Sequence, residues 1–388
     1  MNIPKLRFKD NNGNDYPQWE KKLIKDILKI YHGKDYKNEP NEKKLYPVLG
    51  TGGIITYIDK FLCDWECVLI GRKGTINKPQ YMKTPFWSVD TLFYSKPKLK
   101  QNPKFQYYLF QNINWKIYDE STGVPSLSAS IIEHINRFIP TYAEQEKIAS
   151  FFSTIDKKIE NLTNTITSLE NQKKGLLQQI FSQKLRFKDE NGNNYPNWEK
   201  KKLGKLLSIT SSKRVHEADW TTSGIPFYRA RDIISIFNNK PISKIYISEK
   251  LYEECSSSCG KISENDLLVT GVGTIGIPYL VKKSDKFYFK DGNIIWLKNS
   301  PAIYGKYLFY IFISSYVQKQ INMMTGKGTV GTYTIKNAKD TNILLPCLEE
   351  QTKIADFLSE FDRKLDNQKA QLEHWQQIKK GLLQQMFV

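Results

Sequence analysis

The sequence lacks the long apolar runs that cross membranes. Although 40% of its 388 residues are hydrophobic, no uninterrupted apolar stretch reaches the ~18 residues of a membrane span. The N-terminus also lacks the apolar core of a secretory signal peptide. We therefore expect a cytoplasmic protein whose five cysteines are reduced. A chain of this length and apolar content can bury a real core, and its length predicts two or three domains.

Residues that hold metal ions are few, and their spacing is unsuitable. The four histidines, which show no ligand-like spacing, are His32, His134, His216 and His374. Two cysteine pairs, Cys63/Cys67 and Cys255/Cys259, have a suggestive separation, but they fall at unmatched places in the chain and have no histidine close by. Buried or incidental thiols explain them better than zinc does, and we predict no metal site.

Catalytic motifs are absent or out of context. Residues 271–276 (GVGTIG) and 326–331 (GKGTVG) match G-x-G-x-x-G in letters, but neither opens a predicted helix that could receive a pyrophosphate. There is no G-x-x-x-x-G-K-S/T segment and no Asn/Asp-Pro-Pro-aromatic tetrad. The triplet at 156–158 (Asp-Lys-Lys) lies on a long predicted helix, where its charges are expected to pair with solvent and neighbours. We predict no catalytic activity for this chain alone.

Positive charge is what the sequence has in excess. The 58 Lys and Arg residues exceed the 40 Asp and Glu residues, which gives a formal net charge of +18. Without a membrane signal, this balance favours nucleic acid as the anionic partner. A lysine-rich composition that only aids solubility would give the same balance, so charge alone does not decide between them.

Two long heptad helices organise the chain. Residues 140–181 carry apolar residues at alternating spacings of four and three, which is typical of a coiled-coil seam. Residues 346–388 repeat this stretch with 19 of 43 residues identical. Some 38 helical residues would span roughly 57 Å. Lys173 and Lys379 take equivalent heptad positions, a polar layer of the kind that fixes pairing. The expected seam residues are Ile148, Phe152, Ile155, Ile159, Leu162, Ile166 and Leu169 in the first helix and Ile354, Leu358, Phe361, Leu365, Leu372 and Trp375 in the second.

A second repeat shows that the whole chain is a tandem duplication. The segment at 6–22 (LRFKDNNGNDYPQWEKK) returns at 185–201 with 14 of 17 residues identical. A shared docking role and a recent duplication explain this identity equally well. Each copy precedes a variable block that ends at the proline opening a long helix. Antiparallel helices would let each block sit at one end of the pair, and would place the C-terminus near Leu6.

The two variable blocks read as strand-rich mixed domains. Short β-branched and aromatic runs, such as 224–233 and 266–281 in the second block, are separated by Gly and Pro turns. Each block then has a helix-like stretch (104–113 and 307–321) and a stretch read as a loop (121–140 and 325–346). The predicted fold class is therefore α+β, with two pseudo-symmetric mixed α/β domains separated by two long antiparallel coiled-coil helices.

Several phrases resemble the specificity subunit of type I restriction–modification systems. They are EQxKIAxF near the start and KKGLLQQ near the end of each long helix, and IGRKGTI, FWSVDTLFY and TGVPSLS in the first block. The resemblance covers essentially the whole chain. It implies target-recognition domains at 23–139 and 203–345, conserved segments at 1–22 and 185–202, and spacer helices at 140–184 and 346–388. One departure from the family is the very short first segment.

The resemblance also implies function and partners. Each recognition domain would read one half of a bipartite, asymmetric site in double-stranded DNA, and the helices would set the gap and dock two adenine-methyltransferase subunits. S-adenosylmethionine would bind to those subunits, and ATP and magnesium to a separate restriction subunit, so that this chain binds no cofactor itself. Two other interpretations remain. One is a coiled-coil adaptor with two protein-binding domains, and the other is a self-contained nuclease, against which the missing catalytic motifs count.

Glycine-rich loops with Arg, Lys and Thr are the expected DNA-contacting segments, because glycine lets backbone amides approach phosphates while side chains reach base edges. Glycines that only form turns and charges that are only solvated are the alternative for any one residue. The candidates are Gly52, Gly53, Arg72, Lys73, Thr75 and Lys78 in the first block, with Tyr81 and Trp87 as supports, and Lys213, Arg214, Arg229, Arg231, Thr274, Lys327, Thr329 and Thr332 in the second.

Overall fold

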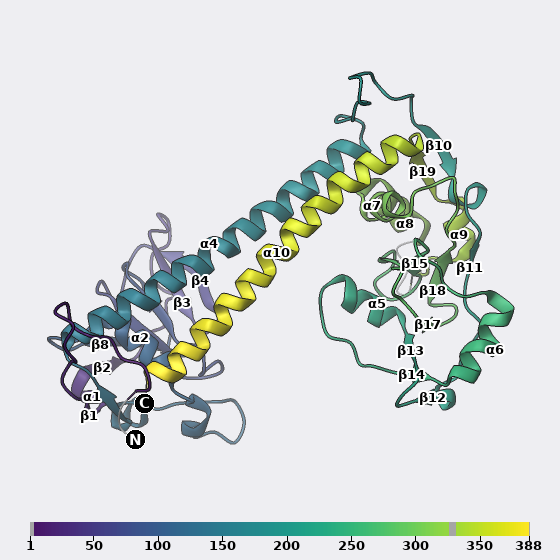
Figure 1. Ribbon diagram of the computed structural model, residues 1–388. Coiled ribbons are helices and arrows are strands. Elements are labelled where there is room, and N and C mark those ends of the chain that lie inside the picture. Colours follow the sequence, from purple (N-terminus) through teal and green to yellow (C-terminus); the bar gives the residue numbers. More distant parts are fainter. Residues whose placement is uncertain (1–3, 326–330, 388) are drawn as a thin grey trace. The chain divides into compact units, whose positions relative to one another are not determined.

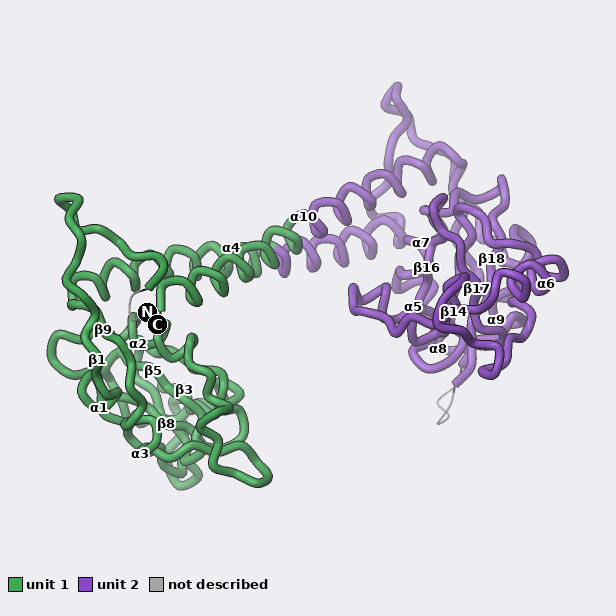
Figure 2. The backbone as a smooth tube through the Cα atoms, turned by 60° about the horizontal axis from the view of Figure 1, so that its bottom comes forward, with its two compact units in different colours: residues 1–165, 368–388 green, residues 166–367 purple. Residues whose placement is uncertain are grey.

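The computed structural model describes residues 4–325 and 331–387, which form two compact units (Figure 2). Unit 1 comprises Met1–Thr165 and Gln368–Val388, and unit 2 comprises Ile166–Asn367. The two long helices, α4 (Tyr142–Phe181) and α10 (Leu348–Met386), contribute a part to each unit (Figure 1). The predicted α+β fold class with two long helices is confirmed.

Unit 1 contains three small sheets. Strands β2, β8, β5 and β6 form an antiparallel sheet in that order, β4, β3 and β7 form a second sheet in which β3 and β7 are parallel, and β1 pairs with β9. The helices are α1 (Ile24–Ile27), α2 (Pro103–Asn112), η1 (Trp115–Tyr118) and α3 (Ala129–His134). The strands are β1 (Glu20–Leu23), β2 (Leu28–Tyr31), β3 (Tyr46–Gly50), β4 (Gly53–Ile58), β5 (Cys67–Gly71), β6 (Gln80–Met82), β7 (Trp87–Ser88), β8 (Leu92–Pro97) and β9 (Asn136–Ile139).

Unit 2 repeats this topology. Its antiparallel sheet has the order β11-β18-β15-β16, its second sheet has the order β12-β14-β13-β17 with β13 and β17 parallel, and β10 pairs with β19. The helices are η2 (Leu203–Lys205), η3 (Glu217–Asp219), α5 (Ala230–Phe237), α6 (Glu249–Cys259), α7 (Gly305–Ile313), α8 (Ser315–Thr325) and α9 (Ile335–Asp340). The strands are β10 (Glu199–Lys202), β11 (Ile209–Thr210), β12 (Trp220–Thr221), β13 (Ile225–Tyr228), β14 (Tyr246–Ile247), β15 (Leu267–Thr270), β16 (Pro278–Leu280), β17 (Tyr288–Phe289), β18 (Ile294–Leu297) and β19 (Asn342–Leu345).

The second sheet is where the two units differ most. In unit 1, β3 turns directly into β4 through a tight hairpin. In unit 2, α5 and a long connection separate the corresponding strands β13 and β14, and α6 follows β14. The additional residues of the second block thus extend one edge of a shared scaffold.

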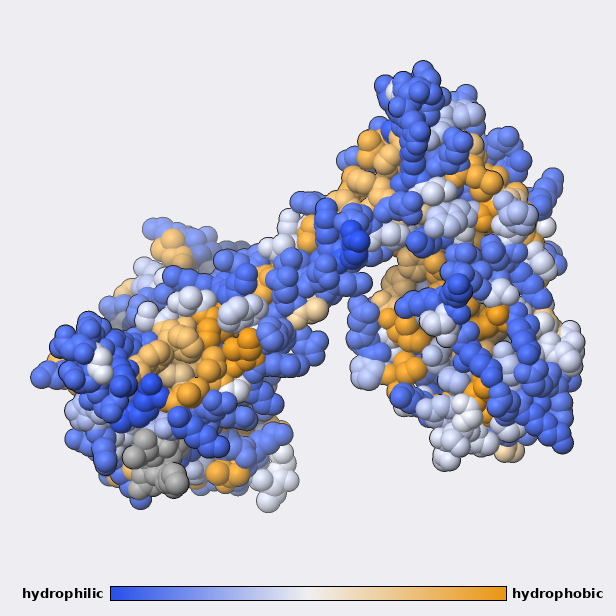
Figure 3. Space-filling view, viewed as in Figure 1, coloured by the Kyte–Doolittle hydropathy of each residue, from blue (hydrophilic) through white to orange (hydrophobic). Residues whose placement is uncertain are grey.

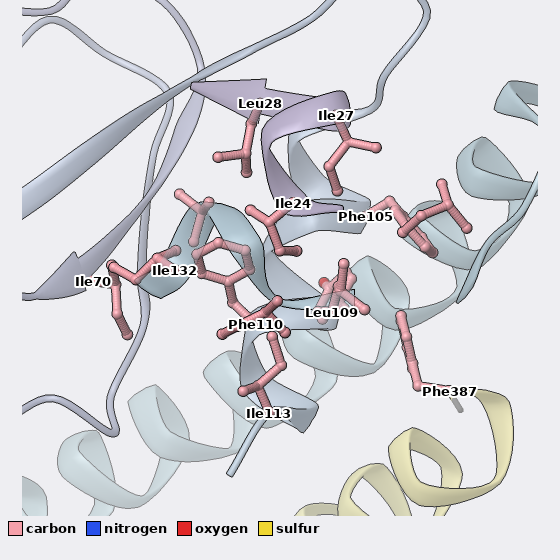
Figure 4. Packing of buried hydrophobic residues seen from close by; sticks show 14 of the residues in the cluster. Ile24, Ile27, Leu28, Ile70, Phe105, Leu109, Phe110, Ile113, Ile132 and Phe387 are labelled. Carbon is pink, nitrogen blue, oxygen red and sulfur yellow. The ribbon is translucent and has the colours of Figure 1, made fainter. Parts of the chain in front are cut away.

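The main core of unit 1 joins its sheets and short helices to the ends of both long helices. Figure 4 shows Phe387, from the end of α10, directed toward Phe105 and Leu109 on α2. The rings of Phe387 and Phe105 stack with centroids 5.5 Å apart, and Phe152 of α4 lies 6.2 Å from Phe387. Because the start of α4 meets the end of α10, the two helices run antiparallel within this unit. In unit 2 the roles of the two helices are exchanged, since its core joins Ile180 and Phe181 at the end of α4 to Ile354 and Leu358 near the start of α10.

All of the predicted seam residues are buried or half-buried. Phe152, Ile354 and Leu358 have no exposed surface, and Leu365 in the middle of α10 is 6% exposed. The buried members are Ile148, Phe152, Ile155, Leu162, Ile166, Ile354, Leu358 and Leu365, and the half-buried members are Ile159, Leu169, Phe361, Leu372 and Trp375.

Several local predictions were wrong. The two stretches read as loops each contain a short helix and a strand, α3 with β9 and α9 with β19. Their glycine and serine content is typical of loops, which led to the wrong prediction. Ser128 and Thr334 in fact cap the two helices, by accepting hydrogen bonds from the backbone N–H groups of Ile131 and Asn337. The stretch read as one helix at 307–321 is two, α7 and α8, because Ser314 is extended. The strand run read at 224–233 ends at Tyr228, and α5 begins at Ala230.

Candidate nucleic-acid interface

Three segments of unit 1 meet at one end of its sheets. The backbone N–H of Gly74, in the β5–β6 loop, donates to Pro125 O at 2.8 Å, and Leu127 N donates to Arg72 O at 2.9 Å. The Gln80 side chain donates to Gly50 O at 2.8 Å at the end of β3. The β3–β4 hairpin, the β5–β6 loop and the segment at 119–127 therefore form one loop surface, which we call loop surface 1.

The first-block candidates lie on loop surface 1. Lys73 and Lys78 are exposed, whereas Arg72 and Thr75 are half-buried. Arg72 also donates from Nη1 to Asp90 O at 3.3 Å, so part of its guanidinium is already engaged. The other candidates, Gly52 and Gly53, form the tip of the hairpin, where an added Cβ would meet no atom within 4 Å. These glycines thus lie on a surface loop. Tyr81 and Trp87, predicted as supporting residues, lie on β6 and β7.

Glycine is required at the base of the β5–β6 loop. A Cβ on Gly71 would stand 2.3 Å from Thr75 O, a distance that the backbone cannot accommodate without moving. The equivalent loop of unit 2 has the same constraint, because a Cβ on Gly271 would stand 2.7 Å from Tyr333 O. Both glycines thus permit close backbone approach, and neither begins a phosphate-binding helix, since β16 follows the second loop.

Unit 2 builds a matching surface, loop surface 2, from the same scaffold. Gly271 N donates to Asn293 O at 2.8 Å, and Tyr333 N donates to Gly271 O at 2.9 Å. The corresponding bonds in unit 1 run from Arg72 N to Thr91 O and from Leu127 N to Arg72 O. The Ser211 hydroxyl donates to Ile294 O and accepts from Gly292 N, which adds the segment after β11. The β15–β16 loop, the β17–β18 loop and the segments near 211–214 and 331–334 therefore lie together.

The second-block candidates fall into different environments. Lys213, Arg214, Arg231, Thr274 and Thr332 are exposed. Arg214 pairs with Asp291 at 2.9 Å while remaining 70% exposed. Lys327 and Thr329 lie outside the described residues.

Arg229 differs from the other arginines because it is bound inside the protein. Its Nε donates to Asp232 Oδ2 at 2.7 Å and its Nη2 donates to Asp232 Oδ1 at 3.0 Å. The side chains are only 11% and 4% exposed. This bidentate pair fixes the start of α5, so Arg229 supports the surface while Arg231 extends from it.

The sequence analysis did not single out three residues beside Arg229. Trp220, Lys290 and Glu217 line a cavity of about 370 Å³ together with Arg229 and Arg231. No sequence motif marks them, because Glu217 and Trp220 lie far along the chain from Lys290 and only the fold brings the three together. On the face drawn in Figure 3, hydrophilic residues cover most of each unit.

The repeated segments form a buried joint with the long helices. In unit 1, Arg7 donates to both carboxylate oxygens of Glu144, from Nε at 3.0 Å and from Nη2 at 2.8 Å, and Trp19 Nε1 donates to Oε2 at 3.1 Å. The Glu144 side chain is fully buried. The hydrogen bonds to Glu144 raise the pKa of the Arg7 guanidinium above its ordinary value. The conserved segment is thus anchored to the first turn of α4.

Unit 2 contains the second copy of this joint. Arg186 donates to Glu350 from Nε at 3.1 Å and from Nη2 at 2.7 Å, and Trp198 Nε1 donates to Oε2 at 2.8 Å. Each repeated segment also contacts the end of a long helix. Leu6 N donates to Gln385 O of α10 in unit 1, and Leu185 N donates to Gln179 O of α4 in unit 2. Much of the 14-of-17 identity is therefore used inside the chain. Arg, Trp and Glu occur at equivalent positions of both repeats in the sequence, but only the fold shows that they contact one another.

Each unit has one charged layer that links both long helices to a shorter helix of the same unit. In unit 1, Asp156 of α4 accepts from Lys379 of α10 at 2.7 Å and from the Tyr108 hydroxyl of α2 at 2.7 Å. In unit 2, Asp362 of α10 pairs with Lys173 of α4 and accepts from the Tyr310 hydroxyl of α7 at 2.7 Å. Burial raises the pKa of both tyrosines.

These layers correct one prediction. Lys173 and Lys379 do not share one layer, because each pairs with an aspartate in its own unit. Asp156, expected to pair with solvent and neighbours, pairs with Lys379 on the other long helix and with Tyr108 on α2. An antiparallel arrangement explains the separate layers, since equivalent positions of the repeats then fall at opposite helix ends.

Among residues 4–325 and 331–387, no group of three or more His, Cys, Asp or Glu side chains could hold a metal ion. Cys63 and Cys67 are both buried, with their sulfurs 3.8 Å apart. The described helices include none that is long and apolar enough to cross a membrane.

Comparison with known proteins identifies the family. Residues 16–171 and 195–374 match the family described as the type I restriction modification DNA specificity domain. The chain is 26% identical to a putative type I restriction enzyme specificity subunit of Haemophilus influenzae, over 81% of this chain and 80% of that one. It is 24% identical to the MjaVIII type I restriction enzyme specificity subunit of Methanocaldococcus jannaschii, over 97% and 94% of the two chains.

Solved structures share the fold. The crystal structure of a type I restriction–modification S subunit from M. genitalium matches with a TM-score of 0.64 at 19% identity, over 100% of this chain and 99% of that one. A chain from a structure of type I restriction–modification complex assembly matches with a TM-score of 0.56 at 14% identity, over 95% and 97%. The chain therefore belongs to the type I restriction–modification DNA specificity family and is a specificity subunit.

Proposed function

We propose that each recognition domain reads one half of a bipartite, asymmetric DNA site for a type I restriction–modification complex. The observation that carries this proposal is the pair of loop surfaces, which share backbone hydrogen bonds but differ in their side chains. Exposed cations such as Lys73, Lys78 and Arg231 suit contacts with phosphates and base edges. Different side chains on one scaffold would read different half-sites.

We further propose that the repeated helix ends bind two copies of one partner, an adenine methyltransferase. Most identical residues of the repeats form intramolecular contacts, but Lys174/Lys380 and Gln178/Gln384 are identical and exposed in both units. A surface that occurs once in each unit suits a partner that binds twice. The chain itself would bind no cofactor, with S-adenosylmethionine on the methyltransferase and ATP and magnesium on a restriction subunit, all in the cytoplasm.

A methylome map tests the DNA-reading proposal. The chain, co-expressed with its cognate methyltransferase subunit in a methylation-free host, is expected to direct adenine methylation to one bipartite motif with a constant gap. Replacing residues 203–345 by the corresponding domain of another specificity subunit should change one half of the motif and leave the other half and the gap unchanged. Replacing residues 23–139 is the matched experiment for the other half. Unmodified DNA from a complex shown to assemble would contradict the proposal and favour a protein-binding adaptor.

Charge reversal at the exposed identical lysines tests the partner surface. We expect Lys174→Glu or Lys380→Glu to reduce the number of methyltransferase copies in the complex from two to one, because each change places a negative charge on one of two equivalent surfaces. The double variant should bind neither copy. Light scattering of the purified complex measures this, with Lys250→Glu on α6 as a control for the same charge change outside the repeats. Two bound copies in the double variant would place the partner elsewhere.

A further inference from the structure

Unit 2 has a cavity beside its second sheet, at the edge where unit 1 has a hairpin. Strands β13 and β17 are parallel, so their carboxyl ends meet at one edge of the sheet, a position where α/β proteins commonly bind ligands. The residues that follow them directly, Arg229 and Lys290, line the cavity of about 370 Å³ together with Arg231 from the first turn of α5. In unit 1 the parallel strands β3 and β7 also end together, but β3 continues into the hairpin at Thr51. Helix α5, which carries Arg231 into the cavity, lies between β13 and β14, where unit 1 has only the hairpin.

Arg229 forms the wall of the cavity rather than its binding group. Its Nε and Nη2 both donate to the Asp232 carboxylate, and Nη2 also donates to Ser243 O at 3.2 Å. The guanidinium lies over the Trp220 ring, with its carbon 5.7 Å from the ring centroid. A cation that is paired and stacked in this way holds the start of α5 against β12.

The unengaged side chains of the cavity are mainly donors. Within the described residues, no hydrogen bond or ion pair engages the side chains of Arg231, Lys290 or Glu217. Trp220 Nε1 is buried without a hydrogen-bond partner, which is uncommon for a donor in a folded protein. The cavity thus offers two cations beside one carboxylate, with the Trp220 ring in its wall.

We propose that this cavity makes the second recognition domain specific for a G·C base pair, with Arg231 as the guanine-reading residue and Glu217 as the cytosine-reading residue. In the major groove a G·C pair presents two acceptors, N7 and O6 of guanine, beside the N4 donor of cytosine. Arginine pairs with the two acceptors through its parallel N–H groups, and a carboxylate accepts from the cytosine amine. A phosphate would use the two cations but leave the Glu217 carboxylate facing another anion, whereas a G·C pair uses donors and acceptor together.

The inference rests on the proposed DNA-reading function and adds a named base pair to it. Lys290 assists by adding positive charge beside the guanine edge. The first recognition domain lacks the helix that carries Arg231, so the G·C requirement applies to one position in the half-site read by residues 203–345.

The test is the methylation rate of the full complex on duplexes that carry each of the four base pairs at every position of that half-site. We expect Arg231→Ala to lower the preference for G·C at one position by about 10- to 100-fold. Glu217→Gln should relax the same position, and Arg231→Lys should retain part of the preference because lysine also binds guanine acceptors. The other positions and the other half-site should be unchanged. Lys250→Ala removes one charge from the same unit outside the cavity and should change nothing.

Three results would overturn the inference. A loss by Arg231→Ala that is uniform across all sequences would make Arg231 a phosphate contact. An unchanged preference in both Arg231→Ala and Glu217→Gln would remove the cavity from base reading. Relaxation at two different positions would separate the two residues. If the wild-type complex assembles but methylates no bipartite motif, the proposed function itself fails, which is a different outcome from any of these.

Discussion

Replacing Arg7 by methionine is expected to lower the free energy of unfolding of unit 1 by about 3–5 kcal/mol. Arg7 holds both oxygens of Glu144, whose side chain has no exposed surface, so the variant leaves a buried carboxylate without its cation. Trp19 alone cannot neutralise that charge. Hydrogen exchange of the amides in α2 measures the stability of unit 1 in the full chain.

Controls for this prediction exist within the chain. Arg137→Met removes an arginine of unit 1 whose one side-chain hydrogen bond, to Asn136 O, is exposed, and should change the stability by less than about 0.5 kcal/mol. Adding Glu144→Gln to Arg7→Met removes the buried charge and should restore part of the loss. An Arg7→Met variant as stable as the wild type would show that the joint is not a source of stability. The matched variant in unit 2 is Arg186→Met, with α7 as the reporter.

The long helices and their pairing could be predicted from the sequence, whereas the contacts of the joint could not. Heptad spacing and the two repeats were sufficient for the long helices and their antiparallel pairing, because apolar burial in a helix pair follows a fixed period. The α+β class followed from the short β-branched and aromatic runs of the two blocks. The identity of 6–22 with 185–201 marked the whole segment, but did not single out Arg7 or Trp19 within it. What the sequence did not indicate was that their partner is a glutamate of the same chain, since that contact spans 137 residues.

Short elements and the candidate site were harder to predict, for physical reasons. Helix α9 has only six residues, and its apolar contribution is largely the buried Ala338, so no periodic pattern distinguishes it from a loop. The cavity beside α5 joins residues from η3, β12, α5 and the segment after β17, which only strand pairing brings together. Sequence reasoning could select Arg229 and Arg231 as cations, but the bond to Asp232 that gives them different roles depends on the local turn of the chain.

The second large effect is expected at the charged layers, where the two units provide an internal comparison. Replacing Asp156 by alanine should destabilise unit 1 by about 3 kcal/mol, because it leaves the Lys379 ammonium without its carboxylate. The Tyr108 hydroxyl would keep only its longer contact with the Ser153 hydroxyl, at 3.4 Å. Lys104 also stands 4.0 Å from Asp156, so the variant leaves two ammonium groups near each other. In unit 2 the aspartate of the layer, Asp362, pairs with one lysine, and Asp362→Ala should cost about 2 kcal/mol.

A double-mutant cycle separates the ion pair from the packing around it. If Asp156 and Lys379 act as a pair, the double variant Asp156→Ala with Lys379→Met should be more stable than the sum of the single losses predicts, by about 1–2 kcal/mol. Hydrogen exchange of α2 for unit 1 and of α7 for unit 2 reports each layer separately. Additive losses would mean that the two side chains are not coupled. Equal losses for Asp156→Ala and Asp362→Ala would show that Lys104 adds nothing to the layer. A larger loss in unit 1 would instead show that its layer neutralises two cations where a long helix, its antiparallel partner and the recognition domain meet.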